Sequence, residues 1–163
     1  MNPKLTGASF GAAIGFISAS FIASPPLIPL ARANSTQTVI VDLSDRKAYL
    51  FQGEAFVASY PVAIGRPGWE TPLGRFQISD MQTNPTWMSP HTGQVVPPGP
   101  NNPIGDRWIE FASKGEFKVG FHGTNRPNSV GWASSDGCLR MRRNDIHQLY
   151  VNVQIGTPVI VQQ

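Results

Sequence analysis

Residues 121–141 read FHGTNRPNSVGWASSDGCLRM, and the rest of the chain is organised around them. This stretch holds Cys138, the only cysteine among the 163 residues, with a histidine sixteen positions upstream at 122. Cysteine attacks as a thiolate and needs a partner that accepts its proton, so the two residues are a candidate nucleophile and base. A buried cysteine that only fills space in the core is the alternative. The flanking residues decide between the two.

The residues beside the thiol and the imidazole suit such chemistry. His122 ends an alternating strand predicted at residues 116–121, and Cys138 precedes the start of another strand. If the two strands are neighbours, the imidazole and the thiol come within hydrogen-bond reach. Gly137 allows a backbone turn that points N–H groups near Cys138 at a developing oxyanion. Arg140 lies two residues further on, on the same face of an extended strand, where it could hold a substrate carboxylate.

Taken singly, these side chains also have ordinary structural roles, such as a hydrogen-bonded histidine or a solvated arginine. A metal site formed by His122, Asp136 and Cys138 is disfavoured, because no two of these ligands have the close spacing that zinc sites favour. His91 and His147 have no partner that the sequence identifies. Both are predicted to be structural or solvated.

The composition indicates one domain of short strands. The chain has 16 glycines, 15 prolines and only 14% charged residues, which argues against a helical bundle. Residues 1–33 contain Lys4 and Arg32 and no acid, so the remainder has 11 basic and 10 acidic residues, a net charge of +1. The three arginines at positions 140, 142 and 143 are too few for a surface that follows phosphates. Nucleic-acid binding is therefore not expected.

The first 33 residues have the features of an export signal. Lys4 precedes an uncharged stretch with a short apolar core, Pro25 and Pro26 interrupt any helix, and residues 31–33 are Ala-Arg-Ala, the small-residue spacing that signal peptidase needs. We predict a cleaved signal at residues 1–33. The alternative is an uncleaved anchor, because the uncharged stretch is long enough to span a bilayer. Either way the domain is exported, and a lone thiol in an exported protein indicates reactivity or intermolecular pairing.

After a short polar lead at residues 34–37, residues 38–163 are predicted to form one mostly β domain. We expect a closed or sandwiched mixed sheet with one or two short helices. The first three strands are joined by turn residues and form a meander. Strands are predicted at residues 38–43, 47–51, 55–64, 75–79, 108–111, 116–121 and 159–161.

Two segments lie between or after these strands. Residues 80–107 are rich in proline and irregular, but their apolar content argues against disorder, so a packed loop with a small hairpin is predicted to lie over the site. A short helix follows residue 141. Its predicted N-cap is Asn144, and its apolar stripe is Ile146, Leu149 and Tyr150.

The order His-Gly-Thr-Asn at residues 122–125, then Ser-Asp-Gly-Cys-Leu-Arg at residues 135–140, resembles the L,D-transpeptidase catalytic domain, also called the YkuD domain. Several more motifs carry the resemblance in the same order, so it covers residues 38–161. They lie at residues 41–50, 61–65, 71–76, 102–105 and 156–159.

The resemblance implies a cysteine acyltransferase of the periplasm or cell wall. In such an enzyme Cys138 would be the nucleophile and His122 its general base, and the backbone carbonyl of Gly123 would orient the histidine ring. The backbone N–H groups of Gly137 and Cys138 would form the oxyanion hole.

The resemblance also implies that the substrate is a peptidoglycan stem peptide, contacted by Arg140, Ser135 and Asp136. An enzyme thioester would form with release of D-alanine, and an amine of a second stem would resolve it to give a 3→3 cross-link. We expect no metal, no organic cofactor and no partner protein, and a domain that acts as a monomer.

One residue departs from the family pattern. The usual Ser-His-Gly-Cys is here Ser-Asp-Gly-Cys, so Asp136 stands in place of a histidine. If residues 136 and 138 are extended, their side chains share a face at about 7 Å, and the carboxylate opposes a thiolate by about 2.4 kcal/mol, or roughly 1.7 pKa units. A salt bridge to Arg140 or Arg142 would reduce this effect.

Three other functions compete with L,D-transpeptidation. An L,D-carboxypeptidase resolves the same acyl-enzyme with water. A catalytically idle wall-binding protein would result if Asp136 suppresses the thiol. A sortase-like transpeptidase also pairs a histidine with a downstream cysteine and arginine, but usually at a much larger separation than 122 to 138.

Overall fold

The computed structural model describes residues 36–163. The predicted export signal at residues 1–33 and the first two residues of the predicted lead lie outside this range. Strand β1 begins at Gln37, the last residue of that lead. Within the described part of the chain, no helix is both long enough and apolar enough to cross a membrane.

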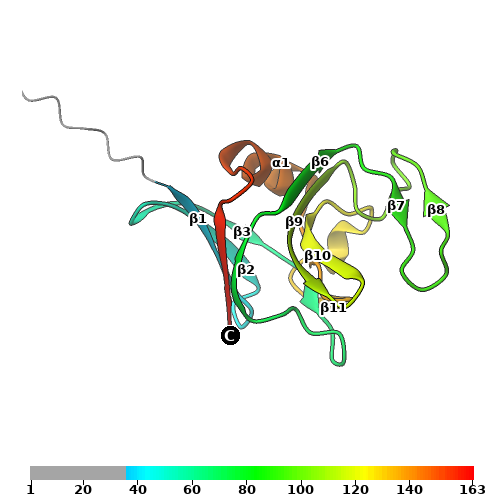
Figure 1. The fold of residues 1–163 in the computed structure, drawn as a ribbon, viewed down its shortest axis with the longest axis horizontal. Coiled ribbons are helices and arrows are strands. Elements are labelled where there is room, and N and C mark those ends of the chain that lie inside the picture. Colours follow the sequence, from blue (N-terminus) through cyan, green and yellow to red (C-terminus); the bar gives the residue numbers. More distant parts are fainter. Residues whose placement is uncertain (1–35) are drawn as a thin grey trace, which may run out of the picture. The chain divides into compact units, whose positions relative to one another are not determined.

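The first sheet contains the predicted meander. Strands β1, β2 and β3 are antiparallel neighbours in sequence order, and β13 adds parallel to β1 and carries β5 at its other edge (Figure 1). The meander is confirmed, although its third strand ends at Pro61 and not at residue 64. The strands are β1 (Gln37–Asp42), β2 (Lys47–Gln52), β3 (Ala55–Pro61), β5 (Gly74–Gln77) and β13 (Pro158–Gln162).

The second sheet has the order β12-β10-β9-β6. Its strands β10 and β12 are parallel neighbours, with Phe121 opposite Leu139 and His122 opposite Arg140. The pairing on which the predicted site depends is therefore present. The strands are β6 (Asp80–Thr83), β9 (Arg107–Lys114), β10 (Phe117–His122) and β12 (Leu139–Arg140).

A single apolar core joins the two sheets and the helix. Val39 and Val41 of β1 enter it from the first sheet, and Phe121 and Leu139 enter it from the second. All four are fully buried. The mostly β architecture predicted from the turn-rich composition is confirmed.

Helix α1 (Arg143–Asn152) covers part of this core with Ile146 and Leu149. It begins one residue before the predicted cap Asn144, because Arg142 already has the extended backbone of a cap residue. A short 3-10 helix (Pro127–Ser129) lies in the connection between β10 and β11 (Ala133–Ser135), and β11 pairs with β4 (Ile64–Gly65).

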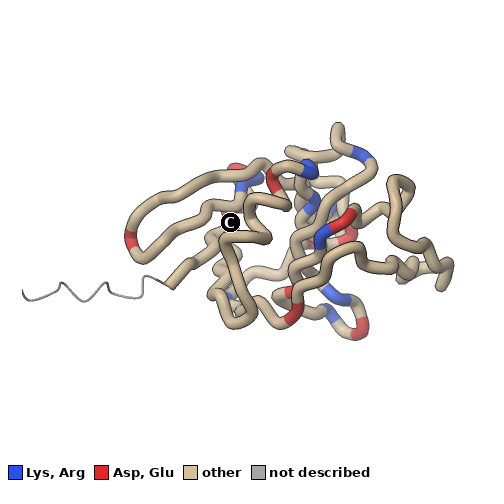
Figure 2. The backbone as a smooth tube through the Cα atoms, turned by 90° about the horizontal axis from the view of Figure 1, so that it is seen from above, with Lys and Arg blue, Asp and Glu red and all other residues tan. Residues whose placement is uncertain are grey.

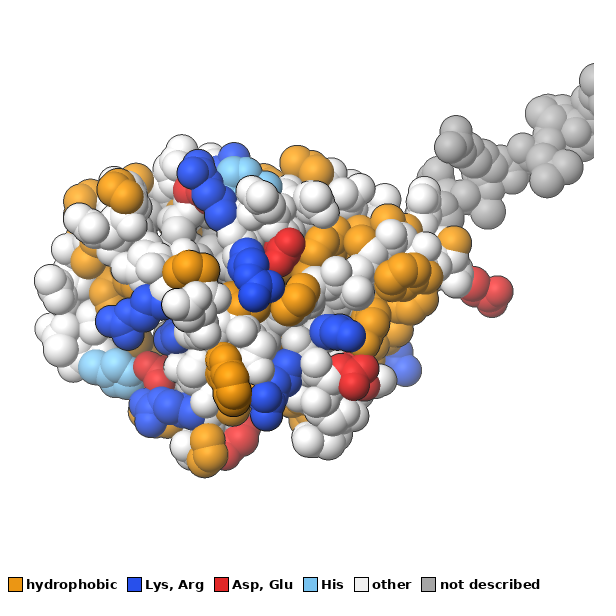
Figure 3. Space-filling model, turned by 180° about the vertical axis from the view of Figure 1, so that it is seen from behind, with side chains coloured by type: hydrophobic (Ala, Val, Ile, Leu, Met, Phe, Trp, Pro, Cys, Tyr) orange, Lys and Arg blue, Asp and Glu red, His pale blue; other side chains and the backbone are white. Residues whose placement is uncertain are grey.

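The proline-rich segment at residues 80–107 contains the predicted hairpin, formed by β7 (Trp87–Met88) and β8 (Val95–Val96). It also contains β6, which was not predicted and pairs with the edge of β9. Charged residues of both signs are interspersed over the described surface (Figures 2 and 3), in keeping with the near balance of acids and bases beyond residue 33.

Candidate active site

Strand alternation places three of the predicted site residues on one face of the second sheet. Phe121 and Leu139 point into the core. Neighbouring residues of a strand point to opposite faces, so His122 and Arg140 point away from the core, and Cys138 does so just before β12. This face is hollowed by a cleft of about 860 Å³ that all three residues line.

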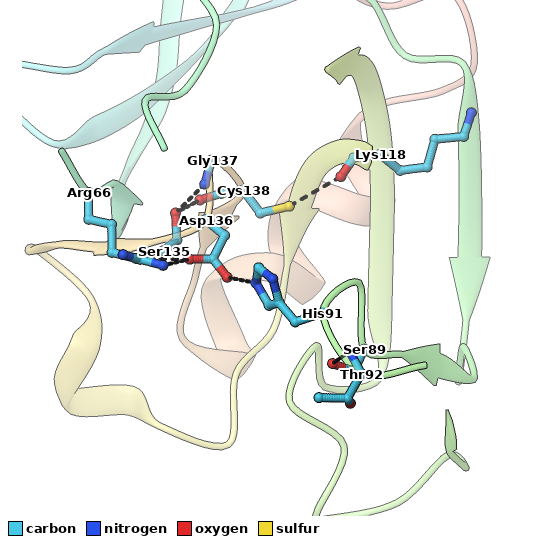
Figure 4. Close-up of polar contacts among 9 residues, drawn as sticks. All are labelled: Arg66, Ser89, His91, Thr92, Lys118, Ser135, Asp136, Gly137 and Cys138. Atoms are coloured by element: carbon cyan, nitrogen blue, oxygen red, sulfur yellow. Dashed lines mark hydrogen bonds and ion pairs between the residues drawn. The ribbon is translucent and has the colours of Figure 1, made fainter. Parts of the chain in front are cut away.

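The nucleophile loop, residues 135–138, is held by hydrogen bonds to its own backbone and to Thr71. Ser135 Oγ donates to the carbonyl of Cys138 at 2.6 Å and accepts from the N–H of Gly137 at 3.2 Å (Figure 4). Thr71 Oγ1 donates to the carbonyl of Gly137 at 3.0 Å. Gly137 has a φ of +108°, a backbone conformation that glycine adopts without steric cost.

These contacts bear on the predicted roles of Gly137 and Ser135. The N–H of Gly137 is donated to Ser135, so of the two predicted oxyanion donors the N–H of Cys138 is the one that remains for a ligand. Ser135 is fully buried, and its hydroxyl bonds the loop backbone. It therefore stabilises the nucleophile loop, and it is also among the residues that line the cleft, so its predicted contact with substrate stays a prediction.

The imidazole of His122 is held in its neutral form. Its side chain is 4% exposed, stacks on Trp108 with 5.9 Å between ring centroids, and hydrogen-bonds through Nδ1 to the carbonyl of Gly123. Burial lowers its pKa from 6.5 to about 4; the Gly123 hydrogen bond opposes this shift and the charge of Arg140 adds to it. With Nδ1 donating to a carbonyl, Nε2 carries the lone pair that can accept a proton.

Cys138 rests as a thiol. Burial raises its pKa from 9.0 to about 11, while a backbone hydrogen bond from Gly120 and the charge of Arg140 act in the opposite direction. Sγ lies 3.5 Å from the carbonyl of Lys118 (Figure 4). Asp136 also raises this pKa, but it is the smallest of the causes. The predicted repulsion between carboxylate and thiolate is thus secondary to desolvation.

The carboxylate of Asp136 pairs with Arg66 and His91, and not with the predicted Arg140 or Arg142. Arg66 Nε and Nη2 each lie 2.9 Å from Oδ1, and His91 Nε2 lies 2.9 Å from Oδ2 (Figure 4). Burial raises the pKa of this carboxyl, but the hydrogen bonds and charges of His91 and Arg66 outweigh it, so the pKa lies below its usual value. The carboxylate is a paired anion.

Arg140 is a half-buried cation without an ion-pair partner among residues 36–163. Burial lowers its pKa, and the negative charge of Asp136 counteracts that shift. A desolvated guanidinium that lines a cleft is suited to a carboxylate ligand. No cluster of three or more potential metal ligands forms in the described part of the chain.

The combination of motif order and cleft geometry agrees with comparison to known proteins. A profile of the L,D-transpeptidase catalytic domain, YkuD, matches residues 36–161. The chain belongs to this family. A Bacillus licheniformis protein named as L,D-transpeptidase YkuD is 31% identical over 160 residues, which cover 98% of this chain and 81% of that protein.

Solved L,D-transpeptidases share the fold. One from Mycobacterium smegmatis has a TM-score of 0.64 at 19% identity, over 78% of this chain and 59% of its own. L,D-transpeptidase 3 from Mycobacterium tuberculosis, in complex with a faropenem-derived adduct, has a TM-score of 0.63 at 20% identity, over 78% of this chain and 60% of its own. The chain thus spans about 60% of these structures, and the predicted L,D-transpeptidase fold is confirmed.

Three residues of this L,D-transpeptidase site were not identified from sequence. Thr71, which holds the nucleophile loop, lies in the Thr-Pro-Leu-Gly motif, so the family resemblance could have pointed to it. Arg66 and His91 lie 70 and 45 residues from Asp136, and no local pattern joins them to it. His147, for which the sequence identified no partner, bonds Asp106 at 2.8 Å, in keeping with a structural role.

Gly105 packs closely against the backbone of Gly123, whose carbonyl accepts the hydrogen bond from His122. It has a φ of +67°, and a Cβ added there would lie 2.9 Å from Gly123 Cα and 3.1 Å from its carbonyl carbon. We expect Gly105→Ala to displace this carbonyl and with it the ring of His122. Alkylation of Cys138 by iodoacetamide at pH 7 is expected to slow about tenfold, because a misplaced base no longer receives the thiol proton.

The matched control is Gly115→Ala, at a φ of +62° with no atom within 4 Å of the added Cβ. Both variants are expected to lose about 1–2 kcal/mol of unfolding free energy through backbone strain, and Gly105→Ala should lose more because its Cβ also meets the backbone of Gly123; both losses are measured by urea denaturation. Only Gly105→Ala should slow alkylation. Equal slowing in both variants would contradict a specific role for Gly105.

Proposed function

We propose that this domain is a peptidoglycan L,D-transpeptidase in which Cys138 is the nucleophile and His122 the general base. Membership of the family supports the reaction class. The observation that carries the assignment of roles is the shared cleft face of Cys138, His122 and Arg140, which follows from the parallel pairing of β10 with β12. The donor substrate is a stem tetrapeptide.

The reaction proceeds in two acyl transfers. Sγ of Cys138 attacks the carbonyl carbon of the third stem residue, and the bond to the terminal D-alanine breaks to leave a thioester. His122 takes the thiol proton and gives it to the departing amine of D-alanine. An amine of a second stem then attacks the thioester and forms the 3→3 cross-link, and its proton returns through His122 to the thiolate.

The pKa values of the pair determine how the first step begins. With the pKa of His122 at about 4 and that of Cys138 at about 11, a neutral imidazole meets a neutral thiol at pH 7. Proton transfer therefore accompanies the attack and does not precede it as a stable ion pair. The N–H of Cys138 stabilises the oxyanion, and Arg140 binds a substrate carboxylate.

The proposal includes export of the domain to the periplasm or cell wall, where this substrate is found. The sequence features of residues 1–33 support export. Expression of the full chain with an epitope tag at its C-terminus, followed by cell fractionation and intact-mass analysis, distinguishes a cleaved signal from an anchor. Recovery of the tagged chain in the cytoplasm would contradict this part of the proposal.

The function is tested by incubating the purified domain with a disaccharide-tetrapeptide and analysing the products by mass spectrometry. We expect free D-alanine and a 3→3 cross-linked dimer. A disaccharide-tripeptide without dimer would indicate water as the acceptor and hence an L,D-carboxypeptidase. Absence of D-alanine, together with absence of a covalent adduct after incubation with faropenem, would indicate a wall-binding protein without catalysis.

A further inference from the structure

The hairpin segment, residues 84–103, forms one wall of the catalytic cleft but is weakly anchored to the core. Trp87, Met88 and His91 of this segment line the cleft together with residues of the nucleophile loop. None of its residues belongs to the apolar core of the described chain, and Met88 and Val95 are 65% and 59% exposed. A segment with few buried apolar contacts opens readily, so its few specific ties determine where it lies.

One such tie runs from the hairpin segment to the nucleophile loop. His91 Nε2 lies 2.9 Å from Asp136 Oδ2, and its ring packs edge-on against Trp69 at 5.2 Å between centroids. Arg66 bonds the other oxygen of Asp136 and lies over Trp69, 5.5 Å from the centroid of its ring. Phe117 is 39% exposed and packs on Trp69 as well.

These contacts connect three segments that are distant in sequence. Asp136 is two residues before the nucleophile, Arg66 follows β4, and His91 lies at the turn of the hairpin (Figure 4). The carboxylate uses one oxygen for Arg66 and the other for His91. Arg66 holds the carboxylate on the body of the domain, which leaves Oδ2 directed at the hairpin segment.

We propose that Asp136 is a positioning residue that latches the hairpin segment to the nucleophile loop through His91, and so sets the width of the cleft at Cys138. The latch keeps this wall closed over the thiol, and breaking it widens access for a bulky ligand more than for a small one. The latch itself does not depend on the reaction; its effect on turnover rests on the proposed function.

The test uses Asp136→Asn and His91→Phe, singly and together. Phenylalanine keeps an aromatic ring against Trp69 while removing the hydrogen bond to Asp136. Hydrogen–deuterium exchange of residues 84–103 is expected to rise about three- to fivefold in each single variant, the upper range for loss of one half-exposed polar side-chain pair. No further rise is expected in the double variant, because both changes break the same contact. Gln94→Ala, on the same hairpin, is the control and should leave exchange unchanged.

Cys138 is the only thiol, so its modification rate reports access to the cleft without any substrate. Modification by a polyethylene-glycol maleimide is expected to accelerate in both single variants by more than modification by N-ethylmaleimide, which carries the same reactive group. The exchanged pair, Asp136→His with His91→Asp, is expected to recover part of the protection of residues 84–103, because an imidazole and a carboxylate can again hydrogen-bond across the same two positions.

The latch is overturned if neither single variant alters exchange or the ratio of the two modification rates. It is equally overturned if Asp136→Asn loosens the hairpin segment while His91→Phe does not, because the carboxylate would then act through Arg66 alone. If the wild-type domain releases no D-alanine but the variants loosen the segment as expected, the latch stands and the proposed function fails.

Discussion

Cys138→Ala is expected to lower the rate of D-alanine release from a stem tetrapeptide by about 10⁴-fold or more. The proposed reaction passes through a thioester on this sulfur, and no second thiol exists in the chain to replace it. Oxyanion stabilisation and substrate binding remain in the variant, but without a nucleophile they have no covalent intermediate to stabilise. Release is measured with a coupled D-amino-acid assay.

The fold of this variant should be intact. Sγ makes a long contact of 3.5 Å to the Lys118 carbonyl, and the loop is held by Ser135 and Thr71. Loss of the Cys138 sulfur atom is therefore expected to change the free energy of unfolding by less than about 1 kcal/mol. Wild type incubated with faropenem should gain the mass of an adduct and the variant should not. Continued D-alanine release by purified Cys138→Ala would rule out the nucleophile assignment.

The strands that flank His122 and Cys138 could be predicted because their signals are local, whereas their pairing was only a condition for the predicted site and is shown by the structure. Residues 116–121 alternate, Gly137 marks a turn, and a short strand follows Cys138. The structure adds a bulge between Val119 and Gly120, which the period of two does not indicate. Strand β6 was not predicted because residues 80–83 are largely polar and show no apolar alternation. It forms at the edge of the sheet, where backbone pairing with β9 is enough.

The surroundings of Asp136 could not be predicted, because they depend on contacts between distant segments. The spacing of residues 136 and 138 predicted a carboxylate close to the thiol and a large repulsion between the carboxylate and a thiolate. In the structure Arg66 and His91 compensate that charge, and desolvation becomes the main cause of the raised pKa of Cys138. Burial and long-range pairing are properties of the packed domain, whereas spacing along the chain reports only which residues share a strand face.

His122→Gln is expected to lower the rate of D-alanine release by about 10²–10⁴-fold, the usual contribution of a general base. Glutamine can still donate to the Gly123 carbonyl, so the change removes mainly the proton acceptor. His147→Gln is the control, since His147 bonds Asp106 and is not among the residues that line the cleft. It should release D-alanine at the wild-type rate, and a comparable loss there would contradict a special role for His122.

The pH dependence gives the same assignment a second test. The pKa of His122 is lowered from 6.5 to about 4 by burial, so wild-type activity should persist to about pH 5 and fall as pH drops through 4, where the base becomes protonated. Between pH 6.5 and 4 the unfolded chain binds this proton and the folded domain does not. Stability therefore falls with falling pH, by up to about 3 kcal/mol.

The glutamine variant cannot bind that proton in either state. Its free energy of unfolding, measured by urea denaturation from pH 7 to pH 4, should therefore decline less than that of wild type, by up to about 3 kcal/mol over this range. An acid limb of activity near pH 6.5 would show instead that the base is solvated, and equal pH slopes of stability would show that His122 is not held neutral by burial. The acid limb of activity and the pH dependence of stability both report protonation of the buried His122 imidazole. The two should therefore agree on the same lowered pKa.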